Sequence, residues 1–395
     1  MKVLIVTPSY FPIIGGSETL ARIFAIKLNQ IGIHADVMTF NMNEKWKPIW
    51  KEETYKNGLF QVFRIPAFNP FPNLLNPLFY LLRVNVIPNP SFLRKLKDYD
   101  VIHFLSEADL SFPVFSYFVN KPKIMHCCGI FKYGGFYWYY MFKRPFLRKV
   151  LKKFFPRIAD EYLVYSSEGK KLLSNLCIPI NKISVLPYSI DTKIFRPKGA
   201  EKLDNLVLFV GRIDRIKGLH ILLQALYHLK VPVHLAIIGP SWDKEYFKEI
   251  EQMISSINEK GIHKVQLLGA MDQSELVRWY QKAAVVVCPY LYETYSIVAL
   301  EALACGTPVV STGTHIIEQK PDGLLISSKN PRDLSMLLEK LVIDKEMRKN
   351  YGRHGRKLVE QYFSWESVLK TLVEKYDDVL NKRFARTTHH KKHSS

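Results

Sequence analysis

The sequence predicts an α/β fold in which two domains each contain a parallel sheet wound by helices. Its 395 residues are enough for two such domains, each with its own hydrophobic core. Along the whole chain, short apolar runs that suit strands alternate with helical patterns, and this alternation favours parallel sheets joined by helices. Pro197, Lys198 and Gly199 indicate a linker between the two halves.

The expected strands follow from short runs rich in β-branched and aromatic residues. In the first half they cover residues 3–7, 35–40, 62–66, 101–105, 123–127, 161–166 and 183–187. In the second half they cover 206–210, 234–238, 265–268, 284–288, 308–311 and 323–326. The expected domains are residues 1–188 and 200–362, followed by a helix over 363–381. The basic tail over 382–395 is expected to be disordered.

The first expected strand leads into a loop that suits a ligand. Gly15 and Gly16 end this loop, and a helix with apolar residues at helical spacing begins at Ser17. The two glycines allow the backbone to approach a ligand closely, with the free amide groups of the helix just behind them. A tight turn between strand and helix would use the same glycines.

A second loop combines a glycine with two cations. Gly211 ends the strand at 206–210, and Arg212 and Lys217 follow it before a helix that begins near Leu219. Two cations at the carboxyl end of a strand, beside a helix N-terminus, suit an anionic ligand such as a diphosphate.

Two glutamates lie around an apolar stretch in the second half. A carboxylate among such residues is costly to bury unless other groups donate hydrogen bonds to it. Gly306 and Pro308 end the helix of this stretch. The better geometry places Glu293 in the loop before the helix and Glu301 within it, both facing a cleft. The alternative is a solvent-facing helix glutamate and an ordinary loop glutamate.

Together these motifs resemble the retaining nucleotide-sugar glycosyltransferases of glycosyltransferase family 4, which have the two-domain GT-B fold. The Glu293-x7-Glu301 pair, the Gly-Arg-x4-Lys-Gly loop and the segment 301–310 carry the resemblance, which extends from Met1 to about Trp365. It implies two Rossmann-like domains facing a cleft, with the last helix returning to the N-terminal domain. It also implies that His126, at the end of the strand at 123–127, is the active-site histidine.

The resemblance further implies the roles of the site residues. Arg212 and Lys217 would stabilise the diphosphate, Glu301 would bind the ribose, and Glu293 and His126 would contact the donor sugar. Front-face attack by an acceptor hydroxyl would retain the anomeric configuration, and the leaving phosphate would take the proton. The catalytic set is His126, Glu293, Arg212 and Lys217. The donor-binding set is Gly15, Gly16, Gly211, Arg212, Lys217, Glu293, Ser296, Ile297, Val298 and Glu301.

Two departures from the family pattern concern the donor. Tyr188 and Ser189 stand where the family usually has Asn-Gly, and Ser296 replaces a glycine that gives access to the backbone. They leave the base and the sugar of the donor open. The same departures are compatible with a second interpretation, in which the protein is a catalytically silent GT-B subunit of a membrane glycosylation complex. An epimerase of the same fold is a weaker rival, because no acid pair beyond Glu293 and Glu301 is evident.

Charge is concentrated in one segment of the first half. Lysine and arginine number 56 against 36 acidic residues, a formal net charge of +20, and residues 110–159 contain no acidic residue. An aromatic run containing Trp138 precedes a basic amphipathic helix whose cations are Arg144, Arg148, Lys149, Lys152 and Lys153. Aromatic residues beside cations suit an anionic membrane surface, where a lipid-linked or other glycan acceptor would be presented. The alternative is an ordinary surface helix packed on the sheet, with a soluble polysaccharide or small molecule as acceptor.

Composition and short motifs limit the other partners. We expect no nucleic acid as partner, because no recognition module is visible. The 5 cysteines show no paired metal-ligand spacing, and the one Asp-x-Asp motif, Asp98 to Asp100, lies away from the expected cleft. With Arg212 and Lys217 on the diphosphate, we expect neither a metal nor another cofactor. No transmembrane run or signal peptide is visible, so we expect a cytoplasmic protein, peripheral on the cytosolic face of a membrane.

Overall fold

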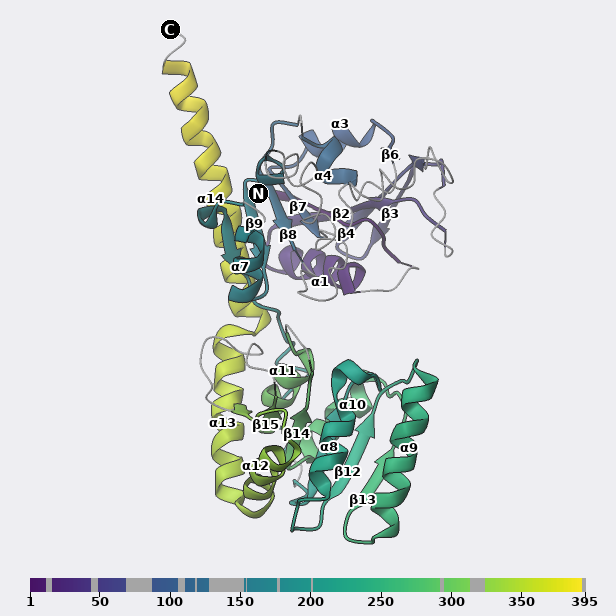
Figure 1. Cartoon of the computed structure of the whole chain (residues 1–395). Helices are drawn as coiled ribbons and strands as arrows, with labels where there is room; N and C mark the ends of the chain where they lie inside the picture. Colours follow the sequence, from purple (N-terminus) through teal and green to yellow (C-terminus); the bar gives the residue numbers. More distant parts are fainter. Residues whose placement is uncertain are drawn as a thin grey trace. The chain divides into compact units, whose positions relative to one another are not determined.

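The computed structural model divides the chain into two compact units. Unit 1 comprises residues 1–186 and 369–395, and unit 2 comprises residues 187–368 (Figure 1). The structure describes all residues except 12–15, 44–48, 69–86, 106–110, 118, 128–152, 154, 176–177, 200–201, 292–294, 313–323 and 393–395, and it does not describe the side chains of 384–392.

Unit 1 is built on a mainly parallel sheet. Among its described residues the sheet has eight strands in the order β10-β9-β8-β7-β1-β2-β4-β3, and only β3 runs antiparallel to its neighbour. A separate two-stranded ladder joins β5 and β6. The strands are β1 Lys2–Val6, β2 His34–Phe40, β3 Glu53–Asn57, β4 Phe60–Ile65, β5 Ala67–Phe68, β6 Ile87–Pro88, β7 Val101–Leu105, β8 Lys123–His126, β9 Glu161–Val164 and β10 Ile183–Val185.

Alternate residues of these strands face two different layers. Leu4 and Phe104 belong to a core on one face. On the other face His103 contacts Phe24 of α1 and Tyr376 of α14. The helices of unit 1 are α1 Gly16–Gln30, α3 Phe92–Lys97, α4 Ser111–Phe115, α7 Ser167–Asn175 and α14 Trp365–Lys392, with 3-10 turns η1 Phe155–Arg157 and η2 Ile180–Lys182.

Unit 2 is a doubly wound parallel sheet. Its strand order is β13-β12-β11-β14-β15-β16, so counted from β11 it is the 3-2-1-4-5-6 order of dinucleotide-binding folds, whose ligand site lies where the order reverses. The strands are β11 Leu206–Val210, β12 His234–Ile238, β13 Lys264–Leu267, β14 Val285–Cys288, β15 Val309–Ser311 and β16 Leu324–Ile326. All of the strand pairs in this sheet are parallel.

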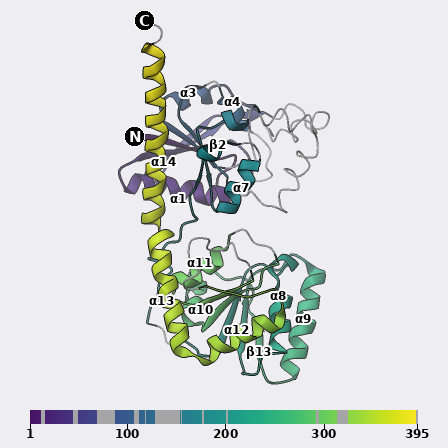
Figure 2. The ribbon, with the colours of Figure 1, turned by 60° about the vertical axis from the view of Figure 1, so that its left-hand side comes forward.

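Helices cover both faces of this sheet, with a separate core under each layer (Figure 2). One layer contains α10 Gln273–Lys282, α11 Ile297–Ala304 and α13 Lys345–Tyr362. The other contains α8 Leu219–Leu226, α9 Lys244–Glu259 and α12 Pro331–Ile343. Gly352 of α13 lies so close to α11 that a Cβ there would be 2.2 Å from the carbonyl oxygen of Gly306. The 3-10 turn η3 Arg215–Lys217 precedes α8.

The predicted strands and the observed ones agree to within two residues at each end. Two strand features were not predicted, the antiparallel β3 and the short β5–β6 ladder. The prediction of a disordered tail is wrong for residues 382–392, because α14 continues to Lys392. At the start of this stretch the helix is held by ion pairs, since Lys382 lies 3.6 Å from Glu161 and Arg383 lies 3.3 Å from Asp160.

Candidate functional site

The candidate donor site lies at the carboxyl edge of the unit 2 sheet, after β11 and β14. These strands are neighbours at the point where the strand order reverses. Gly218 has a φ of 69°, and a Cβ there would be 1.8 Å from the carbonyl oxygen of Pro289. The loop that follows β11 therefore packs directly against the loop that follows β14, and only glycine fits at the contact.

The two cations of the first loop contact different neighbours. The Lys217 Nζ lies 4.7 Å from the centre of the Tyr290 ring, which follows β14. The Arg212 guanidinium lies 5.2 Å from the ring of Trp242, which follows β12, and 3.3 Å from the Asp214 carboxylate. Both cations thus lie at the predicted edge, in the loop after β11. Arg212 is 48% exposed and can turn toward a ligand.

The start of α11 is joined to the same place by hydrogen bonds. Ser296 is its N-cap, and the Ser296 Oγ accepts a hydrogen bond from the Ala299 amide at 3.1 Å. The Tyr290 hydroxyl, whose ring lies under Lys217, is 2.9 Å from the same Oγ. A cation and a capped helix N-terminus, two features that favour an anion, therefore adjoin one tyrosine.

This geometry changes the interpretation of Ser296. Its side chain is buried and serves as cap, so contact with a donor at this position would involve backbone rather than the hydroxyl. Ile297 is exposed and Val298 is half-buried, and their predicted contact with a ligand stays a prediction. Gly211 has a φ of 151°, and the loop is held by a bond from its amide to the Ile238 carbonyl at 3.0 Å.

Glu301 is half-buried on the second turn of α11. Burial raises the pKa of its carboxyl from 4.5 to about 7, and a hydrogen bond from the Tyr280 hydroxyl partly opposes this rise. That hydroxyl lies 2.8 Å from Glu301 Oε2. Tyr280 is thus a hydrogen-bond donor to the carboxyl group in this apolar stretch.

His126 lies at the carboxyl end of β8 in unit 1 and is 1% exposed. Its ring stacks on His103 at 5.6 Å between centroids, and Phe24 and Tyr165 contact it at 6.0 and 5.0 Å. Burial lowers the pKa of His126 to about 3, so the imidazole is neutral near pH 7. Tyr376 of α14 holds His103, with 2.7 Å between the hydroxyl and Nδ1.

Several predicted residues lie outside the described part of the chain. These are Gly15, Glu293, Trp138, Arg144, Arg148, Lys149 and Lys152. Of the predicted membrane cations the structure describes only Lys153, which is exposed. Of the two glycines in the first loop it describes only Gly16, which begins α1. Within the described ranges no group of three or more His, Cys, Asp or Glu side chains is arranged to hold a metal ion.

The structure also contains candidate residues that the sequence did not suggest. Tyr280, Tyr290 and Trp242 support the predicted charges from separate elements, which no local motif signals. Glu18 is buried in the first turn of α1, just after the glycine loop, and accepts a hydrogen bond from the Ser9 hydroxyl. Its position three residues after Gly15 was the only available signal.

Comparison with known families decides the identity of the chain. The family described as glycosyl transferases group 1 matches residues 191–358, and the one described as glycosyltransferase family 4 matches residues 14–194. The chain belongs to the family 4-like glycosyltransferases. The two matches together include most of both units.

Curated relatives and solved structures agree with this family. A D-inositol 3-phosphate glycosyltransferase of Paenarthrobacter aurescens is 28% identical over 234 residues, which are 54% of this chain but only 56% of that protein. An uncharacterized glycosyltransferase of Methanocaldococcus jannaschii is 26% identical over 96% of this chain and 99% of its own length.

Among solved structures, Anabaena HepE in complex with UDP has a TM-score of 0.70 at 16% identity, over 96% of this chain and 100% of its own. A glycosyltransferase of Rickettsia africae has a TM-score of 0.71 at 15% identity, over 96% and 99%. These similarities establish the GT-B fold, with two Rossmann-like domains.

Proposed function

We propose that the protein is a retaining glycosyltransferase that moves a sugar from a nucleotide-sugar donor to a hydroxyl of an acceptor. The arrangement around Tyr290 carries the proposal. Lys217 and the N-terminus of α11 favour a diphosphate, and Glu301, one turn into the same helix, is a half-buried acceptor for sugar hydroxyls. A diphosphate next to a ribose is the shared part of nucleotide sugars.

Known relatives support this choice of donor. The Anabaena protein was solved with UDP and also with UDP-glucose, which are a nucleotide and a nucleotide sugar. The chain departs from the family pattern at Tyr188, Ser189 and Ser296, so the base and the sugar of its own donor are left to experiment.

In the proposed reaction the bond from the anomeric carbon to the diphosphate oxygen breaks as the acceptor oxygen bonds to the same face of that carbon. Negative charge grows on the diphosphate, where Lys217, Arg212 and the α11 amides stabilise it without a metal ion. The acceptor proton passes to the leaving phosphate oxygen. Burial keeps His126 neutral, so any role of this histidine would be as a hydrogen-bonding group rather than as a cation.

The proposed acceptor is a lipid-linked glycan or another glycoconjugate presented at a membrane, with the protein peripheral on the cytosolic face. The basic aromatic segment around residues 131–157 supports this part of the proposal through its sequence. Among the described residues, none of the helices combines the length and the apolar composition needed to span a bilayer.

The direct test is a thermal-shift screen over UDP, GDP, ADP and their sugars, followed by transfer to a hydroxyl acceptor with the donor that stabilises most. A ligand at about one hundred times its dissociation constant adds about 2.7 kcal/mol of stability. NMR of the product should show that the transferred sugar has the same anomeric configuration as in the donor. An inverted product, or a chain that no nucleotide stabilises, would overturn the proposal.

Two matched variants then separate the roles of the glutamates. We expect Glu301→Gln to weaken binding of the free nucleotide, and Glu293→Gln to leave that binding unchanged while slowing transfer. The readouts are nucleotide affinity by calorimetry and kcat with the verified donor. Equal losses of nucleotide affinity in both variants would contradict this division of roles.

A further inference from the structure

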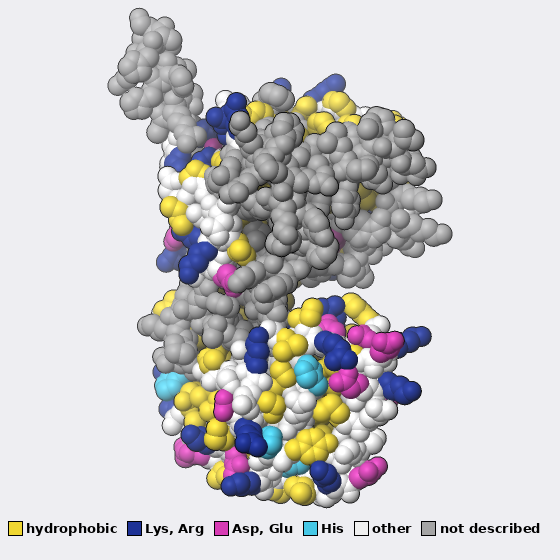
Figure 3. All heavy atoms as spheres, viewed as in Figure 1, with side chains coloured by type: hydrophobic (Ala, Val, Ile, Leu, Met, Phe, Trp, Pro, Cys, Tyr) yellow, Lys and Arg dark blue, Asp and Glu magenta, His cyan; other side chains and the backbone are white. Residues whose placement is uncertain are grey.

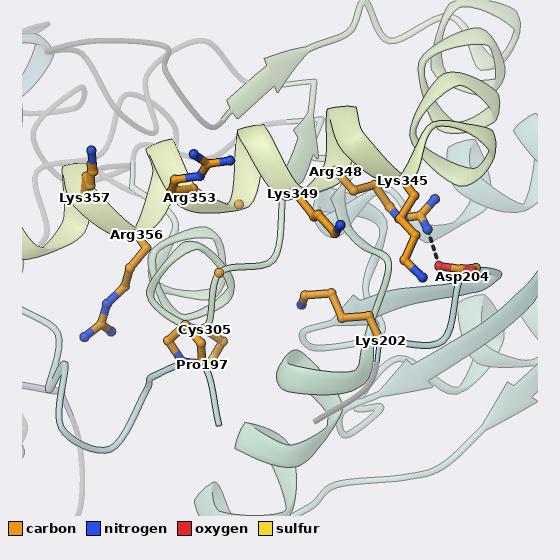
Figure 4. A pocket seen from close by; sticks show the side chains of 12 residues that line it. Pro197, Lys202, Asp204, Cys305, Lys345, Arg348, Lys349, Arg353, Arg356 and Lys357 are labelled. Carbon is orange, nitrogen blue, oxygen red and sulfur yellow. Dashed lines mark hydrogen bonds and ion pairs between the residues drawn. The ribbon is translucent and has the colours of Figure 1, made fainter. Parts of the chain in front are cut away.

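A cavity of about 530 Å³ lies at the amino-terminal edge of the unit 2 sheet. Lys202 and Asp204 in its wall come just before β11, and Gly306 comes just before β15. Helix α13 forms the facing wall (Figure 4). Gly211 and Pro289 follow the carboxyl ends of their strands, so this cavity is on the opposite edge of the sheet from the candidate donor site.

Three of the cations around the cavity have a structural role. The Lys202 Nζ lies 3.3 Å from the Gln281 carbonyl oxygen near the end of α10, and Arg348 Nη1 lies 2.8 Å from the Leu341 carbonyl oxygen near the end of α12. Arg356 Nη1 lies 2.7 Å from the last carbonyl oxygen of α11. These side chains satisfy helix C-termini, where unpaired carbonyl groups and the helix dipole favour a cation.

Four further cations of the cavity wall are not explained by helix ends. They recur every fourth residue on α13 and are therefore neighbours along the helix: Lys345, Lys349, Arg353 and Lys357. All four are exposed. Figure 4 shows Lys345 and Lys349 extending from α13 toward the segment before β11 that carries Lys202.

Little negative charge is available to balance these four cations. Asp204, the one carboxylate of the lining, already pairs with the buried Arg348. Lys349 pairs with the exposed Glu346 at 2.7 Å, a contact that a ligand can replace at small cost. On the face of unit 2 in Figure 3, by contrast, basic and acidic side chains are interspersed. The cavity therefore has a local excess of positive charge.

We propose that this cavity binds a small soluble molecule with two or more phosphate groups. Its volume is within the usual range of ligand sites. Four exposed cations of α13 lie along its wall, more than a single negative charge would need. Its concave form, between α13 and the sheet edge, suits a free phosphate compound better than the headgroup of a lipid in a bilayer.

The probe for the test is inorganic pyrophosphate, titrated by calorimetry into the full chain at moderate salt. All variants carry Lys217→Ala, which weakens the candidate donor site, and they share whatever pyrophosphate binding remains there, so a difference between variants reports on the cavity. We expect Lys345→Ala with Lys349→Ala to weaken pyrophosphate binding at least tenfold. The matched control is Lys244→Ala with Lys248→Ala, two exposed lysines that are also four residues apart, on α9. This control should bind as its parent does.

Two results would overturn the proposal. One is an equal affinity for pyrophosphate in the cavity variant and in the α9 control. The other is binding to vesicles that contain a phosphorylated inositol lipid, lost in the cavity variant, without binding of free pyrophosphate. Because both substituted lysines are exposed, folding should be unchanged, and an unaltered thermal midpoint verifies this. The comparison does not depend on the donor chemistry, because the cavity variant and the α9 control have the same donor site.

Discussion

Replacing Glu301 by glutamine should stabilise the unliganded protein at alkaline pH while it weakens nucleotide binding. Burial favours the protonated carboxyl, so the folded protein binds this proton more tightly than the unfolded chain does. Stability from this group is therefore fully present below pH 4.5 and is lost as pH rises through about 7. Since each tenfold change in proton affinity is about 1.4 kcal/mol, the loss amounts to about 3 kcal/mol.

The glutamine has the same shape and no charge, so it avoids this loss and still accepts the hydrogen bond from Tyr280. At pH 8.5 the variant should be more stable than the wild type by roughly 3 kcal/mol, which raises the Tm by about 6 to 10 °C for a domain of this size. At pH 5 the stability of the variant should be close to that of the wild type. Nucleotide affinity should fall roughly 10- to 100-fold, because hydrogen bonds to charged groups contribute about 1.5 to 3 kcal/mol.

The control is Glu251→Gln, the same chemical change at an exposed position of α9. It should produce no gain that depends on pH. A Glu301→Gln variant that is equally stabilised at both pH values, or less stable than the wild type at pH 8.5, would refute the argument from burial.

Three more predictions concern the donor loop, the metal and the membrane. Lys217→Ala and Arg212→Ala should each lower kcat/KM by roughly 30- to 150-fold, which corresponds to about 2 to 3 kcal/mol. The control Lys244→Ala, at an exposed position, should leave kcat/KM unchanged. Near-normal kcat/KM in both loop variants would exclude the diphosphate role. Transfer should persist in EDTA, and a loss that Mg²⁺ or Mn²⁺ restores would show that a metal is needed. Replacing three cations within 144–153 by glutamate should abolish flotation with anionic liposomes and leave donor hydrolysis unchanged, since each cation near such a surface contributes about 1 kcal/mol. A wild type that does not bind these liposomes would favour a soluble acceptor.

The sequence was sufficient for the fold because buried parallel strands are nearly continuous apolar runs. Leu206–Val210 is buried at every position, and its bounds were predicted without error. By contrast, β3 is a mostly exposed edge strand, Glu53–Asn57, without an apolar pattern to detect. The tail looked disordered from its charge alone, because a single sequence does not reveal that Arg383 meets Asp160.

Site residues were predictable where one local motif contains them. Gly211, Arg212 and Lys217 are such a motif, and so are Ser296 and Glu301. Their partners come from distant segments, as Tyr280 does for Glu301, and these pairings depend on the packing of whole helices. The cap formed by Ser296 was missed for a related reason, since the same serine could have lined a ligand site on an open loop.

The path of α14 has a consequence for the biosynthesis of the protein. Unit 2 is complete when Val368 has been made, whereas unit 1 requires residues 369–395 as well. Until then the buried Leu372, Tyr376 and Val379 cannot cover the first sheet, and His103 lacks the hydroxyl that holds it. The unit that is translated first therefore finishes folding last, and a premature stop just after Val368 would damage the amino-terminal unit while leaving its neighbour whole.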